Sequence, residues 1–203
     1  MLIGVVGFAR AGKDSVGRIL VEKAGFTRLA FADKMKDFAL AIDPYIPIEV
    51  MPPNSGPLIL GEKVEMITHF RRLSKVVDDL GWEKAKTNPE VRRVLQKIGT
   101  EGGRRTVGEN MWVDAADLAH APDRTVVTDV RFLNEAAAIH ALGGVIWRVV
   151  RPGIEPANNH PSEMEQRSIR EDDLIENDGS LEDLADTVML ALERLHGSAL
   201  RLV

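Results

Sequence analysis

The feature that most constrains the fold lies near the start of the chain, where an apolar run enters a glycine-framed loop that ends in Gly-Lys. The run from Leu2 to Val6 predicts a strand, and the loop from Gly7 to Gly12 follows it directly. A helical pattern of apolar residues begins immediately after Lys13. A strand, a loop and a helix in this order form the context that a phosphate-binding P-loop requires. The sequence therefore predicts that backbone N–H groups and the positive end of a new helix surround an anion here.

The parts of this loop have separate predicted roles in binding a nucleotide. Gly7 and Gly12 let the backbone turn without a Cβ clash, and Lys13 places a point charge on the β- and γ-phosphates of ATP. The residue after the lysine is Asp14, where Ser or Thr is usual, and Ser15 follows it. Carboxylate and hydroxyl oxygens both suit Mg²⁺, so we interpret this pair as a variant metal and phosphate end, the alternative being a Gly-rich turn with an incidental lysine. The predicted nucleotide-binding residues of the loop are Gly7, Arg10, Ala11, Gly12, Lys13, Asp14 and Ser15.

Composition narrows the class of protein. The chain has 203 residues and no cysteine, which suits one domain with or without an insert and excludes a disulfide framework or a thiol nucleophile. Its net charge of −5 argues against general binding to nucleic acid. No apolar run approaches the ~18 residues needed to span a membrane. The start of the chain lacks the features of a signal peptide, so we expect a cytoplasmic protein with no membrane partner.

Strands and helices alternate along the chain, which predicts an α/β fold with a parallel sheet covered by helices on both faces. The expected strands are Leu2 to Val6, Phe26 to Phe31, Arg124 to Thr128, Val145 to Val150 and a short one at Leu174 and Ile175. The expected helices begin at or near Lys13, Phe31, Pro89, Asn110, Asn134 and Ser180. In the second helix, Asp33 is the expected cap, and Met35, Phe38, Ala39 and Ile42 are expected to face inward.

The middle of the chain is the least regular part. The segment from Asp43 to Gly61 is rich in proline and predicts an irregular surface excursion, with a loop at Asn54-Ser55-Gly56. The segment from Val64 to Leu80 is expected to be partly helical, and Gly81 is expected to break the helix.

A second candidate site follows the strand predicted at Arg124 to Thr128. This run ends in Asp129, and Arg131 stands two residues later. A P-loop protein places at such a strand end the acid that holds the water shell of Mg²⁺. Asp129 could instead cap the helix that starts near Asn134. Arg131 is placed to clamp a phosphate from the same edge of the sheet.

Other basic and aromatic residues have both a functional and a structural interpretation. Lys34 and Lys36 lie just past a strand end, where ligands bind in α/β sheets, or they are solvated lysines. Arg104 and Arg105 are adjacent, so on a helix they point ~100° apart and only one faces a site. Arginine suits bidentate contact with phosphate, although a solvated basic helix end is the alternative. Trp112 could stack on a base, but filling the core is the default for such a residue.

The loop after the strand at Val145 to Val150 could act as a lid that excludes water. It carries Arg151, His160 and Arg167, and a short charged helix is expected to follow through Arg170. We interpret His160 as a polar loop residue because no metal partner stands near it in the sequence.

These residues together resemble the deoxynucleoside monophosphate kinases of tailed bacteriophages. The segments that carry the resemblance are Gly7 to Ser15, Phe31 to Lys36, Leu95 to Glu101 with Arg104, Trp112-Val113, Asp129 to Glu135, His160 to Glu163 and Ile175 to Gly179. The resemblance covers nearly the whole chain and is weakest over about Asp43 to Glu90. The Gly-Lys-Asp-Ser ending is shared with the family, which supports Asp14 as a competent replacement.

The resemblance implies transfer of the γ-phosphoryl group of ATP to a deoxynucleoside monophosphate, with Mg²⁺, to give ADP and a deoxynucleoside diphosphate. It implies the nucleoside monophosphate kinase type of P-loop NTPase fold, with a five-stranded parallel sheet in a single domain of residues 1–203. An acceptor-binding insert is expected at about 43–110 and a lid at about 151–170. The implied roles are Lys13, Asp129, Arg131 and Arg104 in catalysis; Lys34, Arg104, Trp112, Arg131 and Glu135 at the acceptor; Asp14, Ser15 and Asp129 at the metal; and Arg151 over the ATP. Small nucleotides are the expected partners, and the resemblance allows a homodimer.

Three alternatives stay open from the sequence. The first is a P-loop kinase of another phosphorylated acceptor, such as dephospho-coenzyme A or phosphomevalonate. The second is a regulatory module that binds ATP without an acceptor. The third is an NTPase that processes nucleic acid, against which the acidic net charge speaks.

Overall fold

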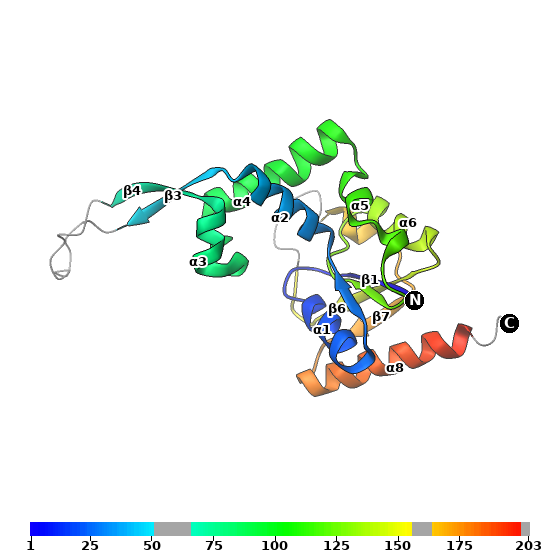
Figure 1. Cartoon of the computed structure of the whole chain (residues 1–203). Coiled ribbons are helices and arrows are strands. Elements are labelled where there is room, and N and C mark those ends of the chain that lie inside the picture. The colour runs from blue at the N-terminus through cyan, green and yellow to red at the C-terminus, as the bar shows by residue number, and fades with distance from the viewer. Residues whose placement is uncertain (51–65, 156–163, 200–203) are drawn as a thin grey trace. The chain divides into compact units, whose positions relative to one another are not determined.

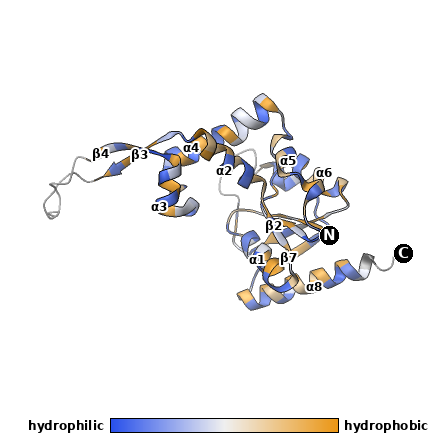
Figure 2. Cartoon of the chain, in the orientation of Figure 1, coloured by the Kyte–Doolittle hydropathy of each residue, from blue (hydrophilic) through white to orange (hydrophobic). Residues whose placement is uncertain are grey.

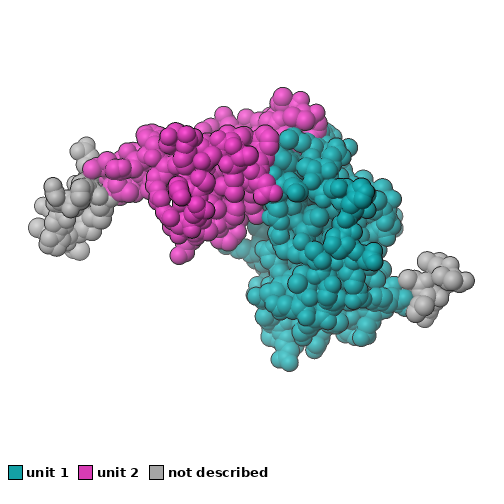
Figure 3. All heavy atoms as spheres, viewed as in Figure 1, with its two compact units in different colours: residues 1–34, 109–203 teal, residues 35–108 magenta. Residues whose placement is uncertain are grey.

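The computed structural model describes residues 1–50, 66–155 and 164–199. The chain divides into two compact units, one of residues 1–34 and 109–203 and the other of residues 35–108 (Figure 3). The second unit corresponds to the insert expected at about 43–110, but it begins earlier, at Met35. Within the described residues, no helix has the length and apolar character needed to cross a membrane.

The first unit is built on a five-stranded parallel sheet (Figure 1). Its strands are β1 (Leu2–Val6), β2 (Thr27–Leu29), β5 (Thr125–Val127), β6 (Val145–Val150) and β7 (Asp173–Glu176). They lie in the order β2-β5-β1-β6-β7, so the strand that enters the P-loop is central and pairs with β5 and β6. The α/β fold class predicted from the alternation of elements is confirmed.

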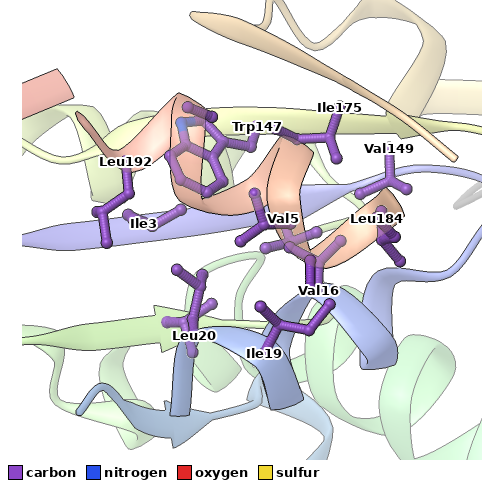
Figure 4. Close-up of a cluster of buried hydrophobic side chains, with 14 of the residues drawn as sticks. Ile3, Val5, Val16, Ile19, Leu20, Trp147, Val149, Ile175, Leu184 and Leu192 are labelled. Atoms are coloured by element: carbon purple, nitrogen blue, oxygen red, sulfur yellow. The ribbon is translucent and has the colours of Figure 1, made fainter. Parts of the chain in front are cut away.

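Helices cover both faces of this sheet. The helices are α1 (Lys13–Ala24), α5 (Met111–Ala116), α6 (Leu133–Ala141) and α8 (Leu181–Ala199), with single 3₁₀ turns at Leu118–His120 and Gln166–Ser168. Ile3 and Val5 of β1 belong to one buried cluster with side chains from α1, β6, β7 and α8 (Figure 4). Gly4, between them, faces the opposite side, where a Cβ would lie 2.6 Å from Cδ1 of Ile139 in α6. The period-2 alternation of strand side chains therefore divides the core into two layers.

The ends of α1 and α8 follow from local sequence. α1 begins at Lys13 and ends at Ala24, and the next residue, Gly25, closes it with a left-handed backbone and φ of 67°. At the start of α8, the amide of Asp183 donates to the Ser180 hydroxyl at 3.2 Å, and that hydroxyl donates to Oδ2 of Asp183 at 2.7 Å. Both helices carry polar and apolar residues along their length, as expected for helices with one buried side (Figure 2). The predicted starts of these two helices, at Lys13 and near Ser180, are confirmed.

The second unit has its own core and a different architecture. The chain enters it through α2 (Phe31–Ile42) and continues as an antiparallel hairpin of β3 (Tyr45–Val50) and β4 (Ile67–Arg72). α3 (Leu73–Ala85), α4 (Pro89–Gln96) and a π-helical stretch from Lys97 to Val107 follow. The buried residues of this unit are Ala39, Ile46, Leu73, Val76, Ala85, Val91 and Leu95. The predicted start of α4 is confirmed, because Pro89 is its first residue and the Asn88 side chain accepts from the amide of Glu90.

Several predictions for this part of the chain are wrong. Asp33 lies in the first turn of α2 and is not its cap, because the helix already begins at Phe31. Phe38 and Ile42 are 44% and 53% exposed, so the buried side of α2 is narrower than predicted. The irregular excursion predicted from Asp43 contains β3. The segment from Val64 to Leu80 is partly helical, as predicted, because α3 begins at Leu73, but β4 precedes that helix.

Other predictions here have mixed outcomes. Gly81 interrupts the helical backbone of α3 with φ of 71°, as expected. Arg104 and Arg105, which were considered as helical residues, lie in the π-helical stretch. The predicted loop at Asn54-Ser55-Gly56 and the prolines Pro52, Pro53 and Pro57 lie outside the described residues.

Candidate nucleotide site

The loop between β1 and α1 has a backbone that only particular residues adopt easily. Gly7, Arg10 and Gly12 have φ values of 154°, 68° and 109°. A Cβ at Gly7 would lie 2.5 Å from the carbonyl oxygen of Val149, so glycine is required there by space as well as by conformation. Arg10 adopts a left-handed backbone as a non-glycine residue, which costs about 1 kcal/mol. The surrounding structure holds the loop in this conformation.

Lys13 closes the loop on itself. Its ammonium donates hydrogen bonds to the carbonyl oxygens of Gly7 at 2.6 Å and Phe8 at 2.9 Å. The amide of Ala11 also donates to the carbonyl of Phe8, at 3.2 Å. The guanidinium of Arg167 lies 5.7 Å from the centroid of the Phe8 ring. The predicted phosphate-binding lysine therefore lies over the loop that precedes its helix, at the amino end of α1.

Asn177 also holds this loop, although no role was predicted for it. It follows β7, and its side-chain Nδ2 donates to the carbonyl oxygen of Ala11 at 2.7 Å. The only sequence indication was its place in the segment Ile175 to Gly179, one of those that carry the family resemblance. No local pattern could indicate its partner, because Ala11 lies at the other end of the chain.

Asp129 follows β5, as predicted, and it contacts α2, which is not the helix expected near Asn134. Its two carboxylate oxygens accept hydrogen bonds from the amides of Phe31 and Ala32, each at 2.9 Å. Asp129 therefore caps α2, and the alternative that it caps the helix after Asn134 is wrong. Burial raises the pKa of Asp129, and the two amides and the charge of Arg131 act in the opposite direction.

Glu135 serves the backbone around Arg131. It is 4% exposed, and its Oε2 accepts from the amide of Arg131 at 2.7 Å and from that of Phe132 at 3.0 Å. These bonds satisfy amides at the start of α6 that the helix itself leaves without a partner. In the structure Glu135 positions the backbone of Arg131, which is itself exposed. The predicted contact between Glu135 and a substrate stays a prediction.

The remaining predicted residues differ in how much surface they present. Trp112 is only 6% exposed, so the core interpretation is confirmed and little of its ring is left for stacking on a base. Lys34 and Arg151 are exposed. Arg104 and Arg105 both lie in the second unit, Arg104 half-buried and Arg105 exposed. His160, from the predicted lid, lies outside the described residues.

Arg28 of β2 is a charged neighbour of the site that the sequence did not single out. Its guanidinium pairs with Asp33 at 2.6 Å. Partial burial acts to lower the pKa of Arg28, but the charges of Asp33, Asp129 and Asp14 outweigh it and raise the pKa. Arg28 therefore brings a positive charge near two of the three predicted metal residues.

The residues predicted to hold Mg²⁺ offer suitable atoms, but they do not form a closed metal site. Asp14 and Ser15 lie in the first turn of α1, and with Asp129 they supply carboxylate and hydroxyl oxygens, which Mg²⁺ prefers. Across residues 1–50, 66–155 and 164–199, no group of three or more His, Asp or Glu side chains could hold a metal ion by itself. Such a donor set fits an ion that is also bound by phosphate oxygens and water.

Comparison with known proteins identifies relatives over much of the chain. A family model described as "Deoxynucleotide monophosphate kinase" matches residues 54–188. A protein of Acanthamoeba polyphaga mimivirus, provisionally named as a deoxynucleotide monophosphate kinase, is 28% identical over 189 residues, which is 86% of each chain. The deoxynucleotide monophosphate kinase of Enterobacteria phage T4 is 29% identical over 150 residues, or 70% of this chain and 61% of the phage protein.

Solved structures show a weaker likeness. Shikimate kinase from Aquifex aeolicus is 12% identical with a TM-score of 0.45, and the match covers 95% of this chain and 96% of that one. Dephospho-CoA kinase from Campylobacter jejuni is 14% identical with a TM-score of 0.42 and the same coverage.

Proposed function

Because the chain belongs to the deoxynucleotide monophosphate kinase family, we propose that it transfers the γ-phosphoryl group of ATP to a deoxynucleoside 5′-monophosphate. An oxygen of the acceptor phosphate forms a bond to the γ-phosphorus, and the bond from that phosphorus to the β,γ-bridging oxygen breaks. The products are ADP and a deoxynucleoside diphosphate.

The observation that carries this proposal is the conformation of the phosphate-binding loop around Lys13. The loop supplies turned backbone, the amino end of α1 and a lysine ammonium at one place. This support is separate from the family match, because residues 7–15 precede the matched range of 54–188. Two independent parts of the chain therefore favour the same chemistry.

Phosphoryl transfer requires little covalent participation by the protein and depends on positioning and on neutralising charge. Lys13 now binds the carbonyls of Gly7 and Phe8, and its ammonium would turn from them to the β- and γ-phosphates of ATP. The first amides of α1 would donate to the same phosphates. This exchange needs no change in the course of β1 or α1.

Asp14, Ser15 and Asp129 are the proposed residues for Mg²⁺. Bound there, the ion would neutralise charge on the phosphate oxygens during transfer. Each carboxylate oxygen of Asp129 already accepts one amide, and a carboxylate oxygen can accept a second hydrogen bond, such as one from metal-bound water. Asp129 would thus hold the water shell while it continues to cap α2.

The acceptor phosphate is assigned to arginine and lysine side chains. Arg131, held by Glu135 through its backbone, and Arg104 would bind the acceptor phosphate or the transferring group. Lys34 would lie near the acceptor, and the unit of residues 35–108 would bind the acceptor nucleoside. Arg151 is the proposed lid residue over the ATP. The family resemblance also supports the proposal of a homodimer. Light scattering of the purified protein tests this proposal.

The test is acceptor-dependent release of ADP by the purified protein with ATP and Mg²⁺. The acceptors are dGMP, dTMP, dCMP, dAMP, the ribonucleotides, dephospho-coenzyme A and phosphomevalonate. Stimulation by one or more deoxynucleotides is the expected result. Stimulation only by another acceptor would retain the phosphate site and replace the substrate, and ATP binding without stimulation would favour a regulatory module.

A further inference from the structure

The conformation of the phosphate-binding loop depends on donors to its carbonyl oxygens. Lys13 supplies donors to Gly7 and Phe8, but the proposed reaction assigns the same ammonium to the phosphates of ATP. The two bonds from Lys13 therefore weaken or break when the nucleotide binds. A donor that stays in place is needed if the strained backbone at Arg10 and the turn at Gly12 are to persist.

Asn177 provides such a donor from another part of the sheet. Its Nδ2 donates to the carbonyl oxygen of Ala11 at 2.7 Å, and its side chain and backbone together are only 7% exposed. The backbone amide of Asn177 donates to the carbonyl oxygen of Val150, at the end of β6, at 2.8 Å. The side chain is therefore fixed at its base by the sheet and reaches the loop from there.

Gly12 and Asn177 also fit each other by shape. A Cβ on Gly12 would lie 2.4 Å from Nδ2 of Asn177, which is closer than atoms approach in real structures. Gly12 has φ of 109°, a backbone that glycine adopts readily. The absence of a side chain at Gly12 thus permits the turn and also leaves room for the side-chain amide of Asn177, which binds Ala11.

We infer that Asn177 is a positioning residue that keeps the phosphate-binding loop in its nucleotide-accepting conformation when Lys13 turns to the phosphates. The inference rests on the proposed use of ATP. Asn177 acts through the carbonyl of Ala11 and does not touch the reacting atoms. Aspartate at this position would place an acceptor against a carbonyl, and alanine would leave a buried carbonyl without its donor.

The experiment compares Asn177→Ala and Asn177→Asp with Thr125→Val, a matched control. Thr125 is also buried and donates through its hydroxyl to a carbonyl, that of Pro122, at 2.9 Å. It pairs with Leu2, so it lies at the end of the sheet opposite the loop. ATP affinity is measured by titration with a fluorescent ATP analogue, the KM values for ATP and for the nucleotide acceptor by steady-state kinetics, and folding by circular dichroism and thermal unfolding.

We expect both Asn177 variants to bind ATP roughly 10- to 100-fold more weakly, since a buried carbonyl loses its donor. The KM for ATP should rise as the affinity for ATP falls, whereas the KM for the acceptor should stay within about twofold of wild type. Thr125→Val should match wild type in ATP affinity and in both KM values. If folded Asn177→Ala lowers the melting temperature but binds ATP as wild type does, Asn177 has only a structural role and the inference is overturned.

A measurement on the wild type covers the case in which neither variant folds. In an NMR hydrogen-exchange experiment, the side-chain NH₂ of Asn177 should stay protected when ATP is added. Loss of protection on ATP binding would contradict the inference. Failure of the wild type to bind ATP at all would overturn the proposed function, a result distinct from failure of the Asn177 variants alone.

Discussion

Oδ1 of Asp129 accepts a hydrogen bond from the amide of Phe31 at 2.9 Å, which joins the end of β5 to the first turn of α2. Its other oxygen accepts from the next amide, so the carboxylate closes the amino end of this helix. The chain passes through α2 from the first compact unit to the second. Asp129, a predicted metal residue, therefore also fixes the start of α2.

Replacement of Asp129 separates these two roles. Asp129→Ala removes both acceptors and should lower the free energy of unfolding by about 1 kcal/mol, the usual cost of losing a helix cap. Asp129→Asn keeps one oxygen acceptor and should lose less stability, yet its Mg²⁺ requirement should rise as much as that of Asp129→Ala, because the carboxylate charge is gone in both. Urea unfolding and Mg²⁺ titration of turnover measure the two effects. An unchanged Mg²⁺ requirement in both variants would show that Asp129 caps α2 and does not serve the metal.

Lys13→Ala should reduce phosphoryl transfer by at least about 100-fold, because a preorganised charge on the transferring group is lost. The fold should persist, since the bonds from Lys13 to Gly7 and Phe8 serve only the loop. Lys23→Ala, in the last turn of the same helix, is the control that removes an exposed lysine away from the loop. Steady-state kinetics and circular dichroism check the result. Near-normal turnover of folded Lys13→Ala would refute the assignment of the phosphate site.

Glu135 offers a test of positioning against direct contact. Glu135→Ala should destabilise the protein by about 1–3 kcal/mol and raise the KM for the acceptor, because two amides lose their acceptor beside Arg131. Glu135→Gln should retain most activity, since a single oxygen accepts from both amides in the structure. Equal losses in the two variants would instead indicate that the charge of Glu135 contacts the substrate.

The fold was largely predictable because its strongest determinants are local. The P-loop sequence specified β1 and α1, and the alternation of elements specified the parallel sheet. The hairpin of the second unit escaped prediction for two reasons. The prolines near β3 indicated an irregular segment, although Ile46, Ile48 and Val50 follow a period-2 alternation. β4 has no such alternation and is exposed along its whole length. The register of the hairpin, which places Pro47 opposite Phe70, depends on pairing between residues distant in sequence.

The site was predictable only where one residue type carries the chemistry. Lys13 and Asp129 were predicted as site residues from loop spacing and from their place beside strands, and the structure places them after β1 and β5 as expected. Asn177 and the cap formed by Asp129 were missed because each depends on a partner about half the chain away or more. Phe38 was misplaced because helical periodicity gives the phase of a buried face but not its width.

The cap at the start of α8 predicts a specific dependence of stability on pH. Hydrogen bonds from the side chain and the amide of Ser180 lower the pKa of Asp183. A carboxyl group with a lowered pKa in the folded state stabilises the fold fully above its ordinary pKa, and this contribution is lost as pH falls through the lowered value. Wild type should therefore exceed Asp183→Asn in urea midpoint at pH 7, and the difference should shrink as pH falls toward about 3. Glu182→Gln is the control, because it removes a charge from the same turn but leaves the cap of Ser180 and Asp183 intact. Its stability should depend on pH as that of wild type does. A difference between wild type and Asp183→Asn that is constant with pH would contradict this account.

The central claim is transfer of a phosphoryl group from ATP to a deoxynucleoside monophosphate, and the most direct measurement follows that group itself. ATP labelled in its γ-phosphate is incubated with the protein, Mg²⁺ and each deoxynucleoside monophosphate, and the products are separated. The account predicts that the label appears in the β-phosphate of a deoxynucleoside diphosphate, in an amount equal to the ADP formed, and that Lys13→Ala does not produce it. Label released only as inorganic phosphate, or label that stays in ATP with every deoxynucleotide, would contradict it.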